Sequence, residues 1–233
     1  MRRVWRLIRV LAITLGLLAA IPLVLVPVYA LVNPVSMPML GRYVTFQKVT
    51  RIWRPIDTIS DRLKAAVVAS EDGQFCRHWG VDLGALRAEI NAWRAGRSPR
   101  GASTISMQVA RNLFLWNGRS FVRKGLEIPI AFYLDLVLPK RRIMEIYLNI
   151  AEWGPDGEFG IEAGAQRAFG IDADAFSWNG AALITVTLPN PHLRNPARPT
   201  RGMARVAGIV ERRARAGASH ITCLYRNGQV QLE

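Results

Sequence analysis

Cysteine and histidine are scarce in this chain of 233 residues, which contains two cysteines and three histidines. The spacing of Cys76 and Cys223 matches no zinc or thiol redox motif, and it leaves open whether they form one disulfide in an oxidising compartment. His78, His192 and His220 form no recognisable triad or metal set, and we expect His78 to be a structural hydrogen-bonding partner. The sequence therefore predicts no metal site built from these side chains.

Charge is absent from Val10 to Val32, a stretch that would cover about 30 Å of hydrocarbon as a helix. We expect a transmembrane anchor at 10–32. Four arginines in residues 1–9 should stay cytoplasmic, which places the chain from Asn33 onward across the membrane. A cleaved secretory signal is the alternative, but the stretch exceeds the about 7 to 15 apolar residues of a normal signal core.

Strand-like alternation and internal repeats are also missing, and helical periodicity dominates the rest of the chain. We expect a mostly α protein with one domain at 57–217. Residues 33–56 are interrupted by prolines and predict an extended linker with little helix, while residues 218–233 form a short, uninformative tail.

Several helix starts are visible as capping residues that precede apolar periodicity. We expect Ser60, Asp82, Ser103 and Ser120 to stand before helices, and Pro139 to lie in the first turn of another. Further helices are expected at about 161–169, 178–188 and 200–216.

Acidic residues are fewer than basic ones, and the formal net charge is +14 at pH 7, of which the N-terminal arginines supply four. A basic body beside a bilayer favours anionic lipid headgroups or an anionic lipid-linked ligand. Nucleic acid is the rival partner for such charge. The expected topology argues against nucleic acid, which is scarce beyond the cytoplasmic face.

The most specific motif is at residues 71–78, EDGQFCRH. Glu71 is expected just past a helix C-terminus, where the dipole and the apolar neighbours Phe75 and Trp79 would make its carboxylate more basic. Glu71 is therefore our first candidate for a general base. The alternative is that Glu71 and Asp72 are solvated turn residues.

Two further segments suggest recognition of an anion. Residues 100–112, RGASTISMQVARN, place Ser103 and Thr104 at a helix start, with Arg111 two turns along. Residues 118–127, GRSFVRKGLE, stack positive charge on one helical face that ends in a carboxylate and suits a diphosphate; the residues concerned are Arg119, Arg123, Lys124 and Glu127. The alternatives are ordinary capping for the first segment and an exposed salt-bridged face for the second. A fourth segment, 140–154, is expected to be mainly structural, with 140–142 facing lipid or solvent.

In this order and spacing, the four segments resemble the peptidoglycan glycosyltransferases, the family of the monofunctional biosynthetic transglycosylases and the N-terminal domains of class A penicillin-binding proteins. The likeness covers roughly residues 45–215 and includes the patterns ED..F..H.G, G.STI..Q, RK..E and K..I.E.YLN, followed by FGIEAGAQRAFG at 159–170. Because no Ser-x-x-Lys motif of a penicillin-binding domain follows, we expect the monofunctional form.

The resemblance implies a lysozyme-like helical fold that polymerises lipid II at the outer face of the bacterial inner membrane, with a periplasmic catalytic domain. Lipid II and the growing glycan strand would be its partners, alongside other cell-wall synthesis proteins. Glu71 would take the proton of the acceptor GlcNAc 4-hydroxyl as it attacks the donor MurNAc anomeric carbon, with inversion. Undecaprenyl diphosphate would leave, stabilised without a strong acid.

The same resemblance carries over a set of binding residues. The diphosphate would be stabilised by Arg119, Lys124, Arg111, Ser103 and Glu127, with support from Asp72, Thr104, Arg123 and Gln108. Glu127 would orient cations or a divalent ion rather than donate a proton. The sequence requires no cofactor and leaves open a Mg²⁺ or Mn²⁺ ion.

This chain departs from the family pattern at three positions. It has Ala102 where glycine is usual, Met107 where the first of two glutamines is usual, and Arg111 where lysine is frequent. Arginine keeps the charge and adds a bidentate fork for phosphate. Met107 removes one amide from the cleft, which bears on rate rather than on reaction type.

Two other functions compete with polymerisation. A lysozyme-like lytic transglycosylase or glycosidase would also use a glutamate, but as an acid toward uncharged glycan, and it has no need of a cationic cradle. A non-catalytic cell-wall scaffold would need neither a catalytic glutamate nor a cationic cradle. The predicted cluster of arginine and lysine favours a phosphorylated donor.

Overall fold

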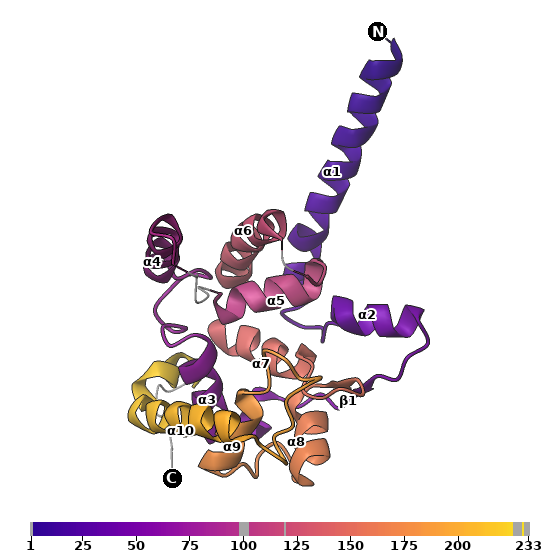
Figure 1. Cartoon of the computed structure of the whole chain (residues 1–233). Coiled ribbons are helices and arrows are strands. Elements are labelled where there is room, and N and C mark those ends of the chain that lie inside the picture. Colours follow the sequence, from indigo (N-terminus) through magenta and orange to yellow (C-terminus); the bar gives the residue numbers. More distant parts are fainter. Residues whose placement is uncertain (1, 98–102, 119, 226–229, 231–233) are drawn as a thin grey trace.

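The computed structural model describes residues 2–97, 103–118, 120–225 and 230, and it is mostly helical, which confirms the expected fold class (Figure 1). The α-helices are α1 (Arg2–Val28), α2 (Met37–Val44), α3 (Asp61–Glu71), α4 (Leu83–Arg94), α5 (Ile105–Phe114), α6 (Phe121–Val137), α7 (Lys140–Ile150), α8 (Ile161–Phe169), α9 (Trp178–Thr185) and α10 (Arg201–Ala216). Two 3₁₀ helices, η1 (Ile56–Thr58) and η2 (Ala218–Leu224), and two short parallel strands, β1 (Thr50–Arg51) and β2 (Glu158–Phe159), complete it.

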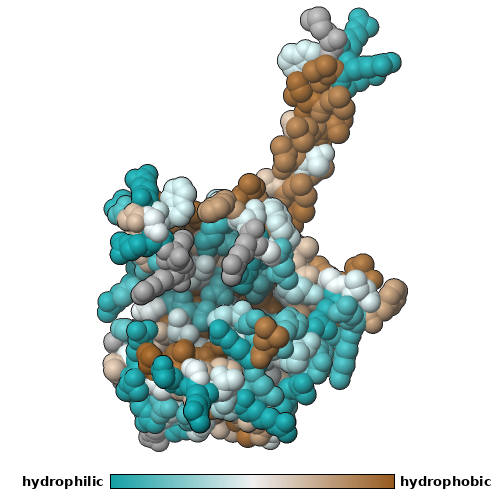
Figure 2. All heavy atoms as spheres, viewed as in Figure 1, coloured by the Kyte–Doolittle hydropathy of each residue, from teal (hydrophilic) through white to brown (hydrophobic). Residues whose placement is uncertain are grey.

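Helix α1 projects from the rest of the molecule (Figure 1). Its most apolar window has a mean hydropathy of 2.5 and is 6% buried, so α1 is long and apolar enough to cross a membrane. Figure 2 shows apolar residues along α1 and hydrophilic ones at its free end and over much of the body. This finding is consistent with the expected single-pass anchor. The hydroxyl of Tyr133 on α6 donates to the carbonyl of Leu23, 3.0 Å away, and fastens α1 to the body.

The core is centred on α7, most of whose residues from Ile143 to Ile150 are buried. Helix α5 packs against α6 and α7, and α3 packs against α9 and α10. In Figure 1, α8, α9 and α10 lie on the side of the body away from α1. The C-terminal end of α3 and the start of α5 therefore meet beside α7, in the middle of the domain.

Most of the expected helix starts are found. Asp82 caps α4, where its carboxylate accepts from the amide of Ala85 at 2.8 Å, and Ser120 caps α6. At α5 the cap is Thr104 rather than Ser103, and Ser60 precedes α3 without a side-chain cap bond. The range 161–169 matches α8, and α10 begins within a residue of its expected start. Helix α9 ends at Thr185, three residues before the expected 188.

The expectation of little helix in residues 33–56 was wrong, because this segment contains α2. Ser36 accepts from the amide of Met39, and proline lies in the first turn, where its missing N–H costs no hydrogen bond. Met39 is fully buried and anchors the helix to the core. The prolines that suggested extended chain therefore mark a helix start.

The expectation that residues 218–233 are only an uninformative tail was also wrong. Its first part is η2, in which Ile221 and Leu224 are buried in the core. Cys223 in η2 forms a disulfide with Cys76, across a sequence separation of 147 residues. The sequence did not decide whether these cysteines are bonded, and the structure contains the disulfide.

Residues 140–142 were expected to face lipid or solvent, and this was wrong as well. Lys140 pairs with Asp135 at 2.7 Å, and Arg141 and Arg142 form ion pairs with Asp57 and Glu145. Arg142 also donates to the carbonyl of Tyr29 at 2.8 Å. The basic start of α7 thus ties α1 to the domain, because the guanidinium of Arg142 donates to the carbonyls of Tyr29 and Val32, which follow the anchor helix.

Candidate active site

Glu71 is the last residue of α3, and neutral groups hold its carboxylate. Ser70 donates its hydroxyl to Oε1 at 3.0 Å, and Gln108 donates its amide to Oε2 at 3.1 Å. In the part of the chain that the structure describes, Glu71 takes part in no ion pair with lysine or arginine. Of the two apolar neighbours expected from the sequence, Trp79 is 70% exposed, and Phe75 is buried with the ammonium of Lys140 4.5 Å from its ring centre. The described contacts of the carboxylate are therefore neutral hydrogen bonds, with no cation among them.

Gln108 is itself held in one orientation by Tyr147 of α7. The hydroxyl of Tyr147 donates to Oε1 of Gln108 at 3.2 Å, so the amide nitrogen of Gln108 faces Glu71. Burial, followed by the nearby Glu71, raises the pKa of Tyr147 well above its usual 10.0. Tyr147 therefore remains a protonated donor, and α7, α5 and α3 are joined by one chain of hydrogen bonds.

Asp72, which follows Glu71 in the chain, positions the start of α5. It is 7% exposed, and its carboxylate accepts from the amide of Ile105 at 2.9 Å and contacts Nε2 of His78 at 2.9 Å. A carboxylate at the start of a helix meets the positive end of the dipole. Asp72 thus fixes the start of α5, and His78 holds Asp72, as a structural role for this histidine requires.

Thr104 is buried and faces the protein rather than a ligand. Its hydroxyl donates to the carbonyl of Gly80 and accepts from the amide of Met107 at 3.1 Å. Gly80 has φ +78°, and a Cβ there would lie 2.3 Å from the carbonyl oxygen of Ala131, so only glycine fits. Thr104 therefore joins the end of the motif at 71–80 to α5.

The cationic residues on α6 come together around Glu127. Glu127 is 2% exposed, and its oxygens pair with Arg123 at 2.5 Å and Lys124 at 3.1 Å. Lys124 also donates to the hydroxyl of Ser103 at 2.6 Å, which brings this cluster against the start of α5. Arg123 is buried and largely neutralised by Glu127, whereas Lys124 is half-buried and reaches the surface. Arg119 lies outside the described residues.

Arg111 lies two turns along α5 and lines a cavity of about 300 Å³. Its Nε is buried and finds no hydrogen-bond partner among the described residues. Gln108 and Tyr147 line the same cavity. Arg111 therefore places a cation at the wall of the cavity that Gln108, the residue that holds Glu71, also lines.

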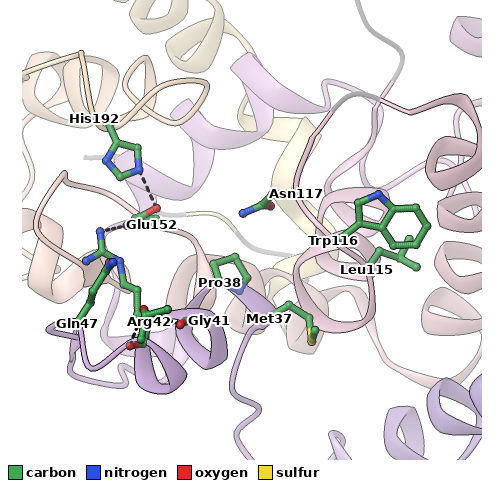
Figure 3. Close-up of a pocket in the computed structure, with 11 residues that line it drawn as sticks. Met37, Pro38, Gly41, Arg42, Gln47, Leu115, Trp116, Asn117, Glu152 and His192 are labelled. Carbon is green, nitrogen blue, oxygen red and sulfur yellow. Dashed lines mark hydrogen bonds and ion pairs between the residues drawn. The ribbon is translucent and has the colours of Figure 1, made fainter.

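This cavity continues toward α2. A second cavity, of about 520 Å³, shares four lining residues with it: Pro38, Asn117, Glu152 and His192 (Figure 3). At their border Glu152 pairs with Arg42 at 3.0 Å and with His192 at 3.2 Å. Glu71 itself lines a third cavity of about 530 Å³, with Arg213 and His220 on its far side.

A family model described as transglycosylase matches residues 39–222. The chain belongs to the transglycosylase family. It is 53% identical over 213 residues to the biosynthetic peptidoglycan transglycosylase of Agrobacterium fabrum, which covers 91% of this chain and 94% of that protein.

Two further relatives carry the same name. The protein of Brucella suis biovar 1 is 52% identical over 90% of this chain and 94% of its own length, and that of Rhodopseudomonas palustris is 48% identical over 92% and 91%. The family expected from the sequence is confirmed, and the lysozyme-like helical class goes with it.

The acidic side chains of the expected diphosphate-binding set, Glu127 and Asp72, are already engaged by protein groups in this transglycosylase. Both oxygens of Glu127 accept from cationic side chains, and Asp72 is engaged by an amide and a histidine. The described residues contain no group of three or more histidine, cysteine, aspartate or glutamate side chains placed to hold a metal ion.

Sequence reasoning missed several lining residues of the transglycosylase cleft. Tyr147 lies in the segment 140–154, which was expected to be mainly structural, and nothing in its spacing signals a hydrogen bond to Gln108. Arg42 lay in the expected linker, and Glu152 lay in a segment taken as structural. The preference of proline for the first turn of a helix was the signal that could have revealed α2 and its cleft residues.

The raised pKa of Tyr147 predicts a pH dependence of stability. In the unfolded chain tyrosine ionises near pH 10, whereas folded Tyr147 keeps its proton. Ionisation therefore stabilises the unfolded state above that pH and lowers the free energy of unfolding. We expect this contribution to be complete below pH 10 and to be lost at up to about 1.4 kcal/mol per pH unit above it. Urea unfolding across this range should show a shallower decline for Tyr147→Phe than for the wild type. Equal declines would contradict the assignment.

Proposed function

We propose that this protein polymerises glycan chains of peptidoglycan from lipid II by inverting glycosyl transfer. The proposal rests on membership of the transglycosylase family and on the printed names of its relatives. The observation that carries it is Gln108, which donates to the carboxylate of Glu71 and lines the same cavity as Arg111. One group can accept a proton and the other can attract a leaving anion.

In the proposed reaction Glu71 takes the proton of the acceptor GlcNAc 4-hydroxyl. The hydroxyl oxygen forms a bond to the anomeric carbon of the donor MurNAc, and the bond from that carbon to the diphosphate oxygen breaks. Undecaprenyl diphosphate leaves with the electron pair, and the α configuration becomes β. Gln108 keeps the carboxylate aimed during the step, because its own amide is fixed by Tyr147.

The departing diphosphate needs positive charge that is not already neutralised. Arg111 supplies a guanidinium group that lines the cavity, and Lys124 supplies an ammonium group that reaches the surface. Arg123 stays buried on Glu127 and keeps that carboxylate from repelling the ligand. Together these cations would stabilise the negative charge of the departing diphosphate without a strong acid.

The exposed apolar residues of the domain are compatible with a lipid-linked substrate. Helix α6, which contacts α1, exposes Phe121, Val122 and Leu136 at 90%, 69% and 72%. Helix α4 exposes Leu83 and Trp93. We infer that this side faces the bilayer in which undecaprenyl chains reside, because large exposed apolar patches mark membrane or protein contacts.

We further propose that the anchor crosses the bacterial inner membrane once, with a cytoplasmic N-terminus and a periplasmic catalytic domain. The arginines before the apolar stretch support this orientation. The Cys76–Cys223 disulfide supports it independently, because disulfides persist in oxidising compartments such as the periplasm. Contacts with other cell-wall synthesis proteins belong to the same proposal.

The competing functions have less support. A glycosidase acting on finished, uncharged glycan gives Arg111 and Lys124 no task. A non-catalytic scaffold would not need the chain of hydrogen bonds that runs from Tyr147 through Gln108 to Glu71. The cationic side of the cleft therefore favours transfer from a phosphorylated donor.

Replacement of Glu71 by glutamine tests the proposed base. Glu71→Gln keeps the size and shape of the side chain and exchanges one acceptor oxygen for a donor amide, and it cannot take a proton at neutral pH. We expect kcat for polymerisation to fall by about 10²- to 10⁴-fold, with little change in melting temperature. The assay is gel separation of glycan made from labelled lipid II. Asp174→Asn, an exposed carboxylate, is the matched control and should polymerise normally. Normal kcat in Glu71→Gln would remove the base from the proposal.

Replacement of Arg111 tests the proposed diphosphate site. We expect Arg111→Gln to lose about 10²-fold in kcat/KM with lipid II, since it removes a charge aimed at the leaving group. Arg111→Lys should recover much of the loss, because it restores the charge without the fork. Arg212→Gln, which removes an exposed arginine on α10, is the control. An equal loss in the lysine and glutamine variants would point to packing instead of charge.

A further inference from the structure

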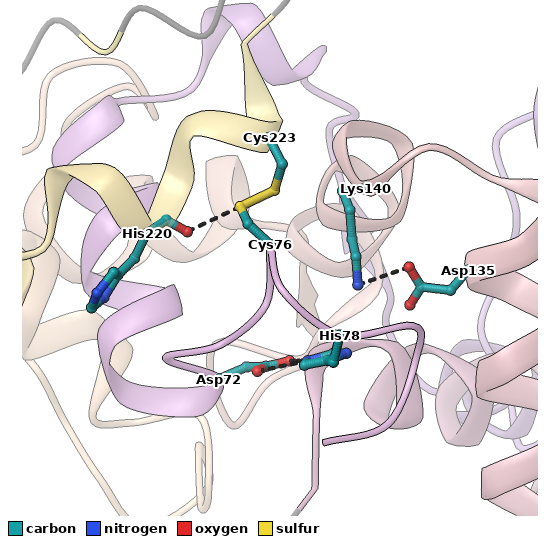
Figure 4. Close-up of a disulfide and its surroundings, with 7 residues drawn as sticks. All are labelled: Asp72, Cys76, His78, Asp135, Lys140, His220 and Cys223. Carbon is teal, nitrogen blue, oxygen red and sulfur yellow. Dashed lines mark hydrogen bonds and ion pairs between the residues drawn. A yellow bond between two sulfur atoms is a disulfide. The ribbon is translucent and has the colours of Figure 1, made fainter. Parts of the chain in front are cut away.

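The disulfide lies inside the segment that carries the candidate catalytic residues. We call residues 72–80 the 72–80 loop, which directly follows Glu71 and leads toward α4. Cys76 stands near its middle, and its sulfur is bonded to Cys223 of η2 (Figure 4). The Cα atoms of the two cysteines are 5.5 Å apart.

Both ends of the 72–80 loop are fastened to α5. At one end Asp72 accepts from the amide of Ile105, and at the other the carbonyl of Gly80 accepts from Thr104. Ile105 and Gln108 are one turn apart on the same helix. A displacement of the loop would therefore reach Gln108, and through it the carboxylate of Glu71.

Between these ends the loop has few other supports. Gly73, Gln74, Arg77 and Trp79 are exposed. Phe75 is buried, with the ammonium of Lys140 4.5 Å from its ring centre and Asp135 paired to that ammonium. Phe75 thus anchors the loop by packing, and Cys76 supplies its covalent tie to another element.

The other half of the disulfide is firmly placed. Ile221 and Leu224, on either side of Cys223, are buried in the core. Arg141 donates to the carbonyl of Leu224 at 3.0 Å. The cross-link therefore ties an exposed loop to a fixed point.

We propose that the Cys76–Cys223 disulfide positions the catalytic loop: it keeps Asp72 on the amide of Ile105 and so keeps Gln108 and Glu71 aligned. This inference rests on the proposed function and adds that glycosyl transfer depends on the oxidised state of these cysteines. Cys76 and Cys223 are positioning residues, which act through Asp72 and Gln108 rather than by touching the substrate.

The test compares oxidised full-length protein in detergent with Cys223→Ser, Cys76→Ser and phosphine-reduced wild type. A water-soluble trialkylphosphine converts the disulfide to two thiols and becomes the phosphine oxide, with the oxygen atom and both protons coming from one water molecule. We expect kcat with lipid II to fall by about 10²-fold in all three forms, while KM stays within about twofold. The exchange of the Ile105 amide with deuterium should become faster.

A matched control separates positioning from stability. Ile184→Val removes a methylene from the buried core of α9, away from the loop, and should lower the melting temperature without lowering kcat. If the cysteine variants do not fold, the time course of reduction in the wild type replaces them: activity should fall as thiols appear, at constant helical circular dichroism.

Two results would overturn the inference. One is wild-type kcat in the folded, reduced protein despite a lower melting temperature, which would leave the disulfide as a stabilising cross-link. The other is unchanged exchange of the Ile105 amide after reduction. If the oxidised wild type makes no glycan from lipid II, the proposed function fails, and the exchange measurement still decides the positioning role.

Discussion

The hydrogen bond between the carboxylate of Asp72 and the amide of Ile105 is the contact on which the active site depends. It places the end of α3 against the first turn of α5, where a negative charge is favoured by the helix dipole. From that turn the next residues along α5 reach outward in order. Gln108 holds Glu71, and Arg111 faces the cavity. Ser103, just before the helix, receives Lys124 from α6.

The charges around this turn are separated by their partners. Glu127 is buried between Arg123 and Lys124, so its charge is neutralised inside the protein. Glu71 has only neutral donors among its described contacts, and Arg111 has a donor with no described partner. A base and a cation that were paired with each other would serve neither task. Gln108 links the two, because it donates to Glu71 and lines the cavity that Arg111 also lines, as their separate proposed roles require.

The sequence predicted well those features that depend on local pattern. The helices of the core, the caps at Asp82 and Ser120, and the placement of Glu71 at the end of α3 all follow from periodicity and short motifs. Features that depend on distant partners were missed or misread. The bond from Cys76 to Cys223 and the ion pair from Arg141 to Asp57 join segments with no local signal. Pro38 was interpreted as part of an extended chain, although it lies in the first turn of α2, which accepts proline equally well.

The most direct test of the account is a double-mutant cycle between Glu71 and Gln108, measured as kcat for lipid II polymerisation. If Gln108 acts by holding Glu71, Gln108→Leu should slow the wild type by about tenfold or more and should add almost nothing in the Glu71→Gln background. If the two losses multiply, Gln108 acts independently of Glu71, and the account of this active site is contradicted.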